Sequence, residues 1–334
     1  MIILGIETSC DETAVALLRA QDGTFVLEKN LVSSQIDIHA PYGGVVPEVA
    51  AREHIKTLPF LLKKILGDTR PDAIAVTAGP GLITSLLIGV QTAKTLASAW
   101  GIPLVRVNHI EAHLLTNWLE NPHLAFPTLG LIVSGGHTEL VLIKNIGEYD
   151  LLGRTRDDAV GECFDKVAQL LGLGYPGGPE ISQHALQGDA LAIILPRPMI
   201  HADNFEFSFS GLKTAVLYLS PEQKKRTADV CAAFQKAVID VLISKTLKAT
   251  RMYDVRSIVF GGGVMANTAL RTEMQKMIET QLPQCAYQFP GPNACTDNAT
   301  MVAVAGYFHI QKKDTISWQQ LDGDPNWEIE QVNY

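Results

Sequence analysis

The sequence is poor in cysteine, and the few that occur exclude two common kinds of stabilising site. An odd number without any CxxC spacing predicts neither a disulfide framework nor a zinc ribbon. We therefore expect free thiols and a reducing, cytoplasmic environment. The five cysteines are Cys10, Cys163, Cys231, Cys285 and Cys295.

Long apolar runs are also missing. The N-terminus reaches Glu7 and a polar turn at once, without the basic and apolar regions of a signal peptide. The most apolar later stretch, Leu82–Val90, is interrupted by Thr84 and Ser85 and is too short to span a bilayer. The sequence therefore predicts no signal peptide and no membrane partner.

An excess of positive charge is absent as well. The net charge of −8 disfavours attraction of the whole surface to nucleic acid or anionic membrane, although a local basic patch is compatible with it. The GxxxxGK[ST] signature does not occur, so this is not a P-loop protein.

What is present describes a folded protein of two domains. The chain has 334 residues, and this length is more than one ordinary core accommodates. Its 47% hydrophobic and 19% charged residues are typical of a folded globular protein. A strand over Asp72–Thr77, a helix over Ser85–Trp100 and a strand over Leu104–Val107 alternate along the first part of the chain. This alternation predicts an α/β lobe over residues 1–107.

Two strand–turn–strand patterns stand about 125 residues apart. Met1–Ile6 and Ala14–Leu18 flank a turn rich in hydroxyls and carboxylates, and Leu129–Val133 and Leu140–Ile143 flank a second polar turn. The repetition indicates an internal duplication that would bring the two turns to face each other across a cleft. Glycines in the second turn would let successive amides approach a phosphate.

His109 and His113 are four residues apart, so on a helix continuing through Leu119 they share one face. Two imidazoles at this spacing can bind one transition-metal ion, or can be a buried pair satisfied by hydrogen bonds. A zinc peptidase would need the glutamate directly after the first histidine, whereas Glu111 comes one residue later. The peptidase interpretation is therefore disfavoured.

The second half contains further helices and one glycine-rich turn. A strand over Ser257–Phe260 ends in Gly261–Asn267 and a helix follows, an arrangement that admits a nucleotide at the helix N-terminus. A tight turn is expected over Tyr175–Glu180 and a long helix over Thr227–Arg251. Asp297 precedes an apolar helix, as a helix-start carboxylate or as a third metal ligand; spacing does not decide between the two.

Six motifs, taken in order, resemble those of one family. Over about residues 2–310 they are similar to the TsaD family, the bacterial tRNA threonylcarbamoyladenosine synthase subunit. Each motif alone is weak, whereas the full set is specific. The motifs are Gly5–Thr13, His109–His113, Val133–Thr138, Phe207–Thr214, Gly261–Asn267 and Thr296–Asn298.

The resemblance implies the actin/hexokinase/Hsp70-like (ASKHA) fold: two duplicated α/β lobes with a nucleotide cleft between them. We expect an N-terminal lobe at 1–107 and a C-terminal lobe at 108–300, with the segment 301–334 packing back on the first lobe. The implied reaction transfers a threonylcarbamoyl group from threonylcarbamoyl-AMP to N6 of adenosine 37, in tRNAs that read ANN codons.

The resemblance also implies site residues. His109, His113 and Asp297 would bind one divalent metal ion, iron or zinc, and Asp165 would bind the ribose hydroxyls. From the carboxylate-rich first turn, Asp11 is our candidate to orient or deprotonate the incoming adenine, with Glu12 as the second candidate. The nucleotide-contacting positions would be Ile132, Val133, Ser134, Gly135, Gly136, Asp165, Gly178 and Asn267.

By the same resemblance the partners are tRNA, a smaller paralogue of the same fold (TsaB-like) as heterodimer partner, and a P-loop ATPase (TsaE-like). Two alternatives stay open: a small-molecule kinase of this fold, and a non-catalytic nucleotide-binding scaffold like the paralogue, which lacks the paired histidines. The chain departs from the family pattern at Ala112 (usually Gly), at Met265 (usually Ser), and before Trp327, where Asp324-Pro325-Asn326 replaces an Arg-Pro pair.

Overall fold

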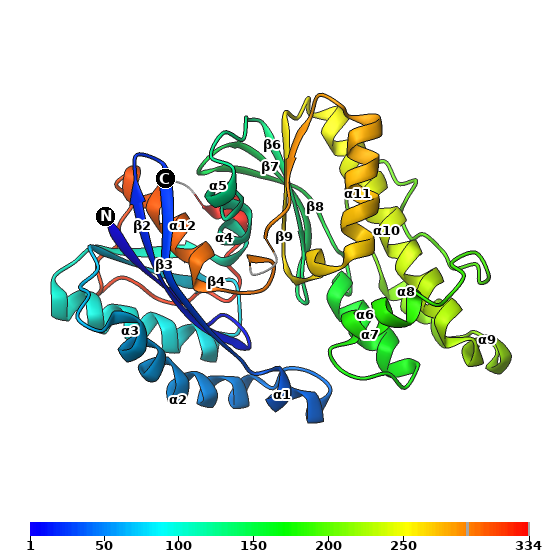
Figure 1. Cartoon of the computed structure of the whole chain (residues 1–334), viewed down its shortest axis with the longest axis horizontal. Coiled ribbons are helices and arrows are strands. Elements are labelled where there is room, and N and C mark those ends of the chain that lie inside the picture. Colours follow the sequence, from blue (N-terminus) through cyan, green and yellow to red (C-terminus); the bar gives the residue numbers. More distant parts are fainter. Residues whose placement is uncertain (292–293, 333–334) are drawn as a thin grey trace. The chain divides into compact units, whose positions relative to one another are not determined.

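A computed structural model describes residues 1–291 and 294–332 (Figure 1). The chain forms two compact units. The first unit includes residues 108–123 and 296–300, which the sequence placed in the second lobe; the predicted lobe boundaries stay a prediction, and the last two residues of its 301–334 segment lie outside the described residues. The first unit is Met1–His123, Ile146–Tyr149 and Thr296–Tyr334, and the second is Leu124–Asn145 and Asp150–Cys295.

The first unit is built on a five-stranded sheet in the order β3-β2-β1-β4-β5. The predicted first hairpin is confirmed, because β1 pairs antiparallel with β2 with Gly5 opposite Ala16. β1 and β4 pair in parallel, as do β4 and β5. The mostly exposed β3 was not predicted. The strands are β1 (Ile2–Glu7), β2 (Glu12–Gln21), β3 (Thr24–Ser34), β4 (Ala73–Gly79) and β5 (Leu104–Asn108).

Helices cover this sheet. α2 (Pro47–Leu66) and α3 (Ile83–Trp100) pack on each other and on β2 and β4, while α12 (Ala299–Gln311) packs on β1, β2 and β4 (Figure 1). Small residues let α12 approach closely: a Cβ on Gly5 would overlap the carbonyl oxygen of Ala299. The short helices α1 (Ile36–His39) and η1 (Ala40–Tyr42) precede α2.

The helix predicted from His109 through Leu119 is wrong in its length, because it is divided at Thr116. α4 (His109–Leu115) ends there and α5 (Asn117–Glu120) follows. The side-chain amide of Asn117 donates to the Leu114 carbonyl at 2.9 Å, so it competes with the backbone amides that would continue the helix.

The C-terminal tail packs on the ends of β4 and β5. The Asp324 amide donates to the Ala78 carbonyl at 2.7 Å, and the side chain of Asn108 donates to the Trp327 carbonyl at 3.0 Å. The Arg106 guanidinium lies 4.9 Å from the centre of the Trp327 ring. A short 3₁₀ turn, η4 (Ile329–Gln331), closes the described part of the tail.

The second unit repeats the strand pattern of the first. Its sheet order, β10-β9-β6-β7-β8, matches the first sheet when β6 corresponds to β1, and the predicted second hairpin is confirmed by the antiparallel pairing of β6 and β7. The repeated order bears out the predicted duplication. The strands are β6 (Thr128–Val133), β7 (Thr138–Asn145), β8 (Glu148–Arg154), β9 (Ser257–Gly261) and β10 (Ala286–Gln288).

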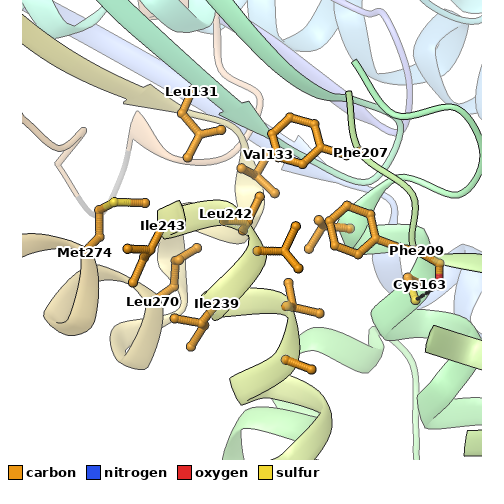
Figure 2. Packing of buried hydrophobic residues seen from close by; sticks show 14 of the residues in the cluster. Leu131, Val133, Cys163, Phe207, Phe209, Ile239, Leu242, Ile243, Leu270 and Met274 are labelled. Atoms are coloured by element: carbon orange, nitrogen blue, oxygen red, sulfur yellow. Dashed lines mark hydrogen bonds between the residues drawn. The ribbon is translucent and has the colours of Figure 1, made fainter. Parts of the chain in front are cut away.

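The core of the second unit lies around α10 (Thr227–Met252). Figure 2 shows side chains of β6 facing those of α10, with two phenylalanines on one side and residues of α11 (Thr268–Gln281) on the other. The remaining helical elements are α6 (Val160–Leu170), α7 (Gly177–Ala185), α8 (Ser210–Leu217), α9 (Pro221–Lys225) and η2 (Gly263–Ala266).

One further prediction in this unit is wrong. The tight turn expected over Tyr175–Glu180 is shorter than predicted, because α7 already begins at Gly177. Proline at position 179 is tolerated there because it lies in the first helical turn.

Among the described residues, no helix is long and apolar enough to cross a membrane.

Candidate functional site

The three predicted metal ligands come together within the first unit. The Asp297 carboxylate oxygen Oδ1 lies 3.0 Å from Nε2 of His113 and 3.5 Å from Nε2 of His109. The two imidazole rings stand edge to face, with centroids 4.7 Å apart. One potential ligand atom from each residue lies within 4.8 Å of the others. These three residues are a candidate metal site, and we refer to them as the metal centre.

The local sequence fixes where the ligand helix begins. Asn108 is the N-cap of α4, and its side-chain oxygen accepts hydrogen bonds from the amides of Ile110 and Glu111. Asparagine is favoured at this position because it satisfies amides that have no partner inside the helix. The first turn of α4 therefore starts at His109, and the ring four residues later falls on the same face.

The donor set and its spacing fit a metal ion. Bonds of about 2.1 Å in a tetrahedral arrangement place ligand atoms about 3.4 Å apart, close to the distances between Asp297 and the two histidines. His113 is fully buried, and its Nδ1 atom has no hydrogen-bond partner in the described part of the chain. The Nε2 atom of this ring is directed at a carboxylate oxygen, so the two groups are placed to share a divalent ion.

Glu7, at the end of β1, is a site residue that the sequence reasoning missed. Its buried carboxylate lies 3.1 Å from Nδ1 of His109 and accepts hydrogen bonds from the Thr77 hydroxyl at 2.6 Å and the Ser9 amide at 2.5 Å. The available signal was a glutamate directly continuing an apolar strand, where a charge is costly to bury without a partner. A carboxylate on the second ring nitrogen fixes the orientation of a metal-binding histidine.

The charged groups of this cluster shift one another's pKa values. Burial would lower the pKa of His109, but Asp297 and Glu7 outweigh burial and raise the pKa to about 9. Burial would raise the pKa of Glu7, but the charge and hydrogen bond of His109 lower it. In the metal-free chain His109 therefore carries a proton at neutral pH, and a metal ion must displace that proton.

The turn that carries Asp11 is held at each of its residues. The Thr8 hydroxyl donates to the Ser85 carbonyl, and the Ser9 carbonyl accepts from the Leu82 amide. The Cys10 carbonyl lies 2.9 Å from Nε2 of His54, and the Asp11 carbonyl accepts from the Gln35 amide at 3.0 Å. These bonds come from different elements, so the turn is rigidly placed beside β1.

The two candidate catalytic carboxylates differ in their surroundings. Asp11 and Glu12 are both half-buried, and Glu12 accepts a hydrogen bond from the Ser34 hydroxyl at 3.2 Å. Burial, followed by the charges of Asp297 and Asp11, raises the pKa of Glu12 to about 10. A negative charge on Glu12 is thus disfavoured in the metal-free chain.

The predicted phosphate-binding residues lie at the end of β6 in the second unit. Ile132 and Val133 are buried strand residues, and Ser134 begins the turn. The Ser134 side chain accepts a hydrogen bond from the His137 amide at 3.0 Å, whereas Gly135 and Gly136 are exposed. The exposed glycine backbone leaves this turn accessible to a ligand.

The other predicted nucleotide residues are joined by hydrogen bonds around α7. Asp165 of α6 accepts from the Gly177 amide at 2.7 Å, one residue before Gly178. The Asn267 side chain caps α11 and donates to the Ser182 hydroxyl at 3.0 Å and to Gln235 at 2.8 Å. Ser182 also donates to the Gly178 carbonyl. The structure thus links Gly178 and Asn267 through Ser182. Ser182 and Gln235 were not predicted from the sequence, because neither belongs to a recognisable motif.

The fold places the chain in a class of proteins. Full-length HypF, crystallised in a phosphate- and nucleotide-bound form, has a TM-score of 0.62 at 13% identity, covering 94% of this chain and 56% of HypF. The (R)-2-hydroxyglutaryl-CoA dehydratase component A of Acidaminococcus fermentans gives 0.54 at 12% identity, covering 94% and 99%. A ROK hexokinase of Thermus thermophilus gives 0.51 at 16% identity, covering 93% and 100%. The chain therefore has the actin/hexokinase/Hsp70-like fold.

Sequence comparison identifies the family within this class. A relative in Thermosipho africanus, named tRNA N6-adenosine threonylcarbamoyltransferase, is 49% identical over 98% of this chain and all of its own length. One of the same name in Desulfitobacterium hafniense is 49% identical over 95% of this chain and 94% of its own length. The sequence model of TsaD, the tRNA N6-adenosine threonylcarbamoyltransferase family, matches residues 26–304. The chain belongs to the TsaD family.

Proposed function

We propose that this chain transfers a threonylcarbamoyl group from threonylcarbamoyl-AMP to N6 of adenosine 37, in tRNAs that read ANN codons, with a divalent metal ion bound by His109, His113 and Asp297. The observation that carries the proposal is the convergence of two helix histidines with a carboxylate 184 residues further along the chain. Family membership supplies the reaction, and this convergence supports the metal.

Two histidines and one carboxylate suit either iron(II) or zinc, and both leave coordination positions open. When bound, the ion would supply Lewis-acid stabilisation of charge that develops on the carbamoyl oxygen. Glu7 would hold the ring of His109 in the orientation that directs Nε2 toward Asp297.

The remaining steps fall to the side chains and backbone of this chain. Transfer breaks the bond between the carbamoyl carbon and the phosphate oxygen, forms a bond from that carbon to N6, and removes one proton from the amine, while AMP leaves. Asp11 would orient the amine and accept its proton. The amides of Ser134–Gly136 would bind the phosphate, Asp165 the ribose hydroxyls, and Gly178 with Asn267 the adenosine.

Glu111 gives an observation against the peptidase alternative. Its carboxylate is fully buried and hydrogen-bonded to the side chains of Tyr149 and His309, so it cannot serve as the water-activating base. A small-molecule kinase of this fold would need no His/His/Asp centre, which is why this chain's ligand set favours the transferase.

We further propose a cytoplasmic enzyme that works with a smaller TsaB-like paralogue and a TsaE-like P-loop ATPase. Binding of tRNA depends mainly on positive charge, and the net charge of this chain is −8. A partner subunit or a local basic surface would supply the attraction. A steep salt dependence of tRNA binding by the isolated chain would argue against the partner.

The reaction is tested by reconstitution. The purified chain, the two partner proteins and threonylcarbamoyl-AMP are incubated with an ANN-reading tRNA, and the digested nucleosides are analysed by mass spectrometry. We expect threonylcarbamoyladenosine with the wild type, none with a tRNA carrying guanosine at position 37, and loss of both product and bound metal with His109→Ala. Full activity of metal-free protein would refute the metal assignment, and ATP-dependent phosphorylation of a sugar would favour the kinase.

A further inference from the structure

Glu111 stands between the two histidines of the metal centre but takes no part in the proposed chemistry. Both oxygens of its buried carboxylate have hydrogen-bond partners. Oε1 accepts a hydrogen bond from the Tyr149 hydroxyl at 2.7 Å, and Oε2 lies 2.9 Å from Nε2 of His309. All of these groups belong to the first unit. A carboxylate so fully engaged acts through its neighbours.

His309 connects Glu111 to a second carboxylate. Its Nδ1 lies 2.7 Å from Asp314, just beyond the end of α12, and its ring is buried. Burial would lower the pKa of His309, but Glu111 and Asp314 raise it to about 9. The group is therefore a buried imidazolium between two carboxylates, an arrangement in which removal of one partner leaves an uncompensated charge.

The two ends of α12 hold opposite sides of α4. Each residue turns an α-helix by about 100°, so Glu111 points roughly 200° away from His109. Asp297, two residues before α12, meets the histidines, while His309 in the last turn of α12 meets Glu111. Contacts on both sides fix the rotation of α4 as well as its distance from α12.

His113 depends on this attachment more than His109 does. Glu7 holds the Nδ1 atom of His109, whereas the buried Nδ1 of His113 has no hydrogen-bond partner among residues 1–291 and 294–332. The direction of the His113 ring therefore follows from the position of α4. A site of this kind requires its ligands to be held within about 0.5 Å.

We infer that Glu111 and His309 are positioning residues of the metal centre: their buried contact sets the rotation of α4 against α12, so that both histidines meet Asp297 in binding geometry. The inference rests on the proposed metal site. It gives a reason for the glutamate of this motif that differs from the role of the peptidase glutamate.

Metal titration of the full-length chain tests this. The protein is stripped of metal and titrated with Zn²⁺ against a chromophoric chelator, and its Co²⁺ form is examined by visible absorption. We expect Glu111→Gln and His309→Ala to weaken Zn²⁺ binding about 10- to 100-fold and to change the Co²⁺ spectrum. His309→Gln, which keeps a donor toward Glu111, should recover part of the affinity. Tyr149→Phe removes one neutral donor, keeps the charges, and should weaken binding a few-fold.

The matched control is Asp240→Asn in the second unit. It breaks contacts with Arg197 and Lys236 in a partly exposed ion-pair cluster that lies far from the metal ligands in sequence. We expect it to lower thermal stability without changing the Zn²⁺ dissociation constant or the Co²⁺ spectrum. Wild-type Zn²⁺ affinity and spectrum in Glu111→Gln and His309→Ala would overturn the inference alone. A wild-type chain that binds Zn²⁺ no better than His109→Ala would overturn the proposed metal site and the inference with it.

Discussion

Glu7 lies 3.1 Å from Nδ1 of His109, on the side of the imidazole opposite the Nε2 atom that faces Asp297. The last residue of β1 and the first residue of α4 are 102 positions apart in the chain. Their contact joins the first hairpin to the ligand helix, so the direction of the ring is set by the sheet.

Replacing this carboxylate should weaken the metal centre. Glu7→Gln keeps the shape but removes the negative charge that favours an N–H on the facing nitrogen. We expect Zn²⁺ affinity and transferase activity each to fall about 10- to 100-fold. Equilibrium dialysis measures the first, and nucleoside analysis the second. Thr77→Val, which removes only a neutral donor to the same carboxylate, should cost much less; equal losses in both variants would contradict the charge argument.

Metal binding should release a proton. The pKa of His109 is raised to about 9, because Asp297 and Glu7 outweigh burial, so below pH 9 the ion competes with a proton on this ring. Affinity should therefore rise with pH, by close to tenfold per pH unit at most, and level off above about 9. Calorimetric titration in buffers of different protonation enthalpy counts the released proton. An affinity unchanged between pH 6.5 and 8.5 would speak against this.

Asp11→Asn should separate catalysis from metal binding. If Asp11 accepts the amine proton, we expect the transfer rate to fall about 10²- to 10⁴-fold while Zn²⁺ affinity stays near that of the wild type. Single-turnover transfer to tRNA measures the rate. Asp22→Asn, at an exposed position between β2 and β3, is the matched control and should leave the rate unchanged. Transfer at the normal rate by Asp11→Asn would remove Asp11 from the mechanism.

A side chain at Gly79 should disturb the packing of the C-terminal tail on β4. A Cβ at this position would overlap the Asp324 carbonyl oxygen, whereas one on Gly44 would meet no atom within 4 Å. We expect Gly79→Ala to lower the free energy of unfolding by about 2–4 kcal/mol and the melting temperature by roughly 5–15 °C. Gly44→Ala should change it by less than about 0.5 kcal/mol. Calorimetry checks both, and equal melting temperatures would show that the tail is not seated as described.

Much of the architecture followed from local pattern. β1, β2, β6 and β7 were predictable as hairpins because buried strands read as short apolar runs between polar turns. α10 was predictable because its apolar spacing persists for several turns, and α12 because it is a nearly continuous apolar run of helical length. β3 was not, since its exposed face carries no alternation that distinguishes it from a loop. The break at Thr116 depends on one side-chain amide and has no periodic signature.

The candidate site was only partly visible in the sequence. The histidine pair has a helical spacing, but Asp297 could be joined to it only through family resemblance, because no local rule connects residues so distant. Glu7, His309 and Tyr149 were missed for the same reason. Each is an ordinary residue in its own segment and acquires its meaning from a partner on another element.

The division of the first unit into separate segments has a consequence for synthesis on the ribosome. β1–β5 and α4 emerge early, but α12, which covers the first sheet and follows Asp297, emerges only after the second unit. At about 5–20 residues per second, roughly 170 intervening residues take on the order of ten to thirty seconds. During that interval the nascent chain presents two histidines without their carboxylate and a sheet face without its helix. The three candidate ligands can therefore come together only after the second unit has been synthesised.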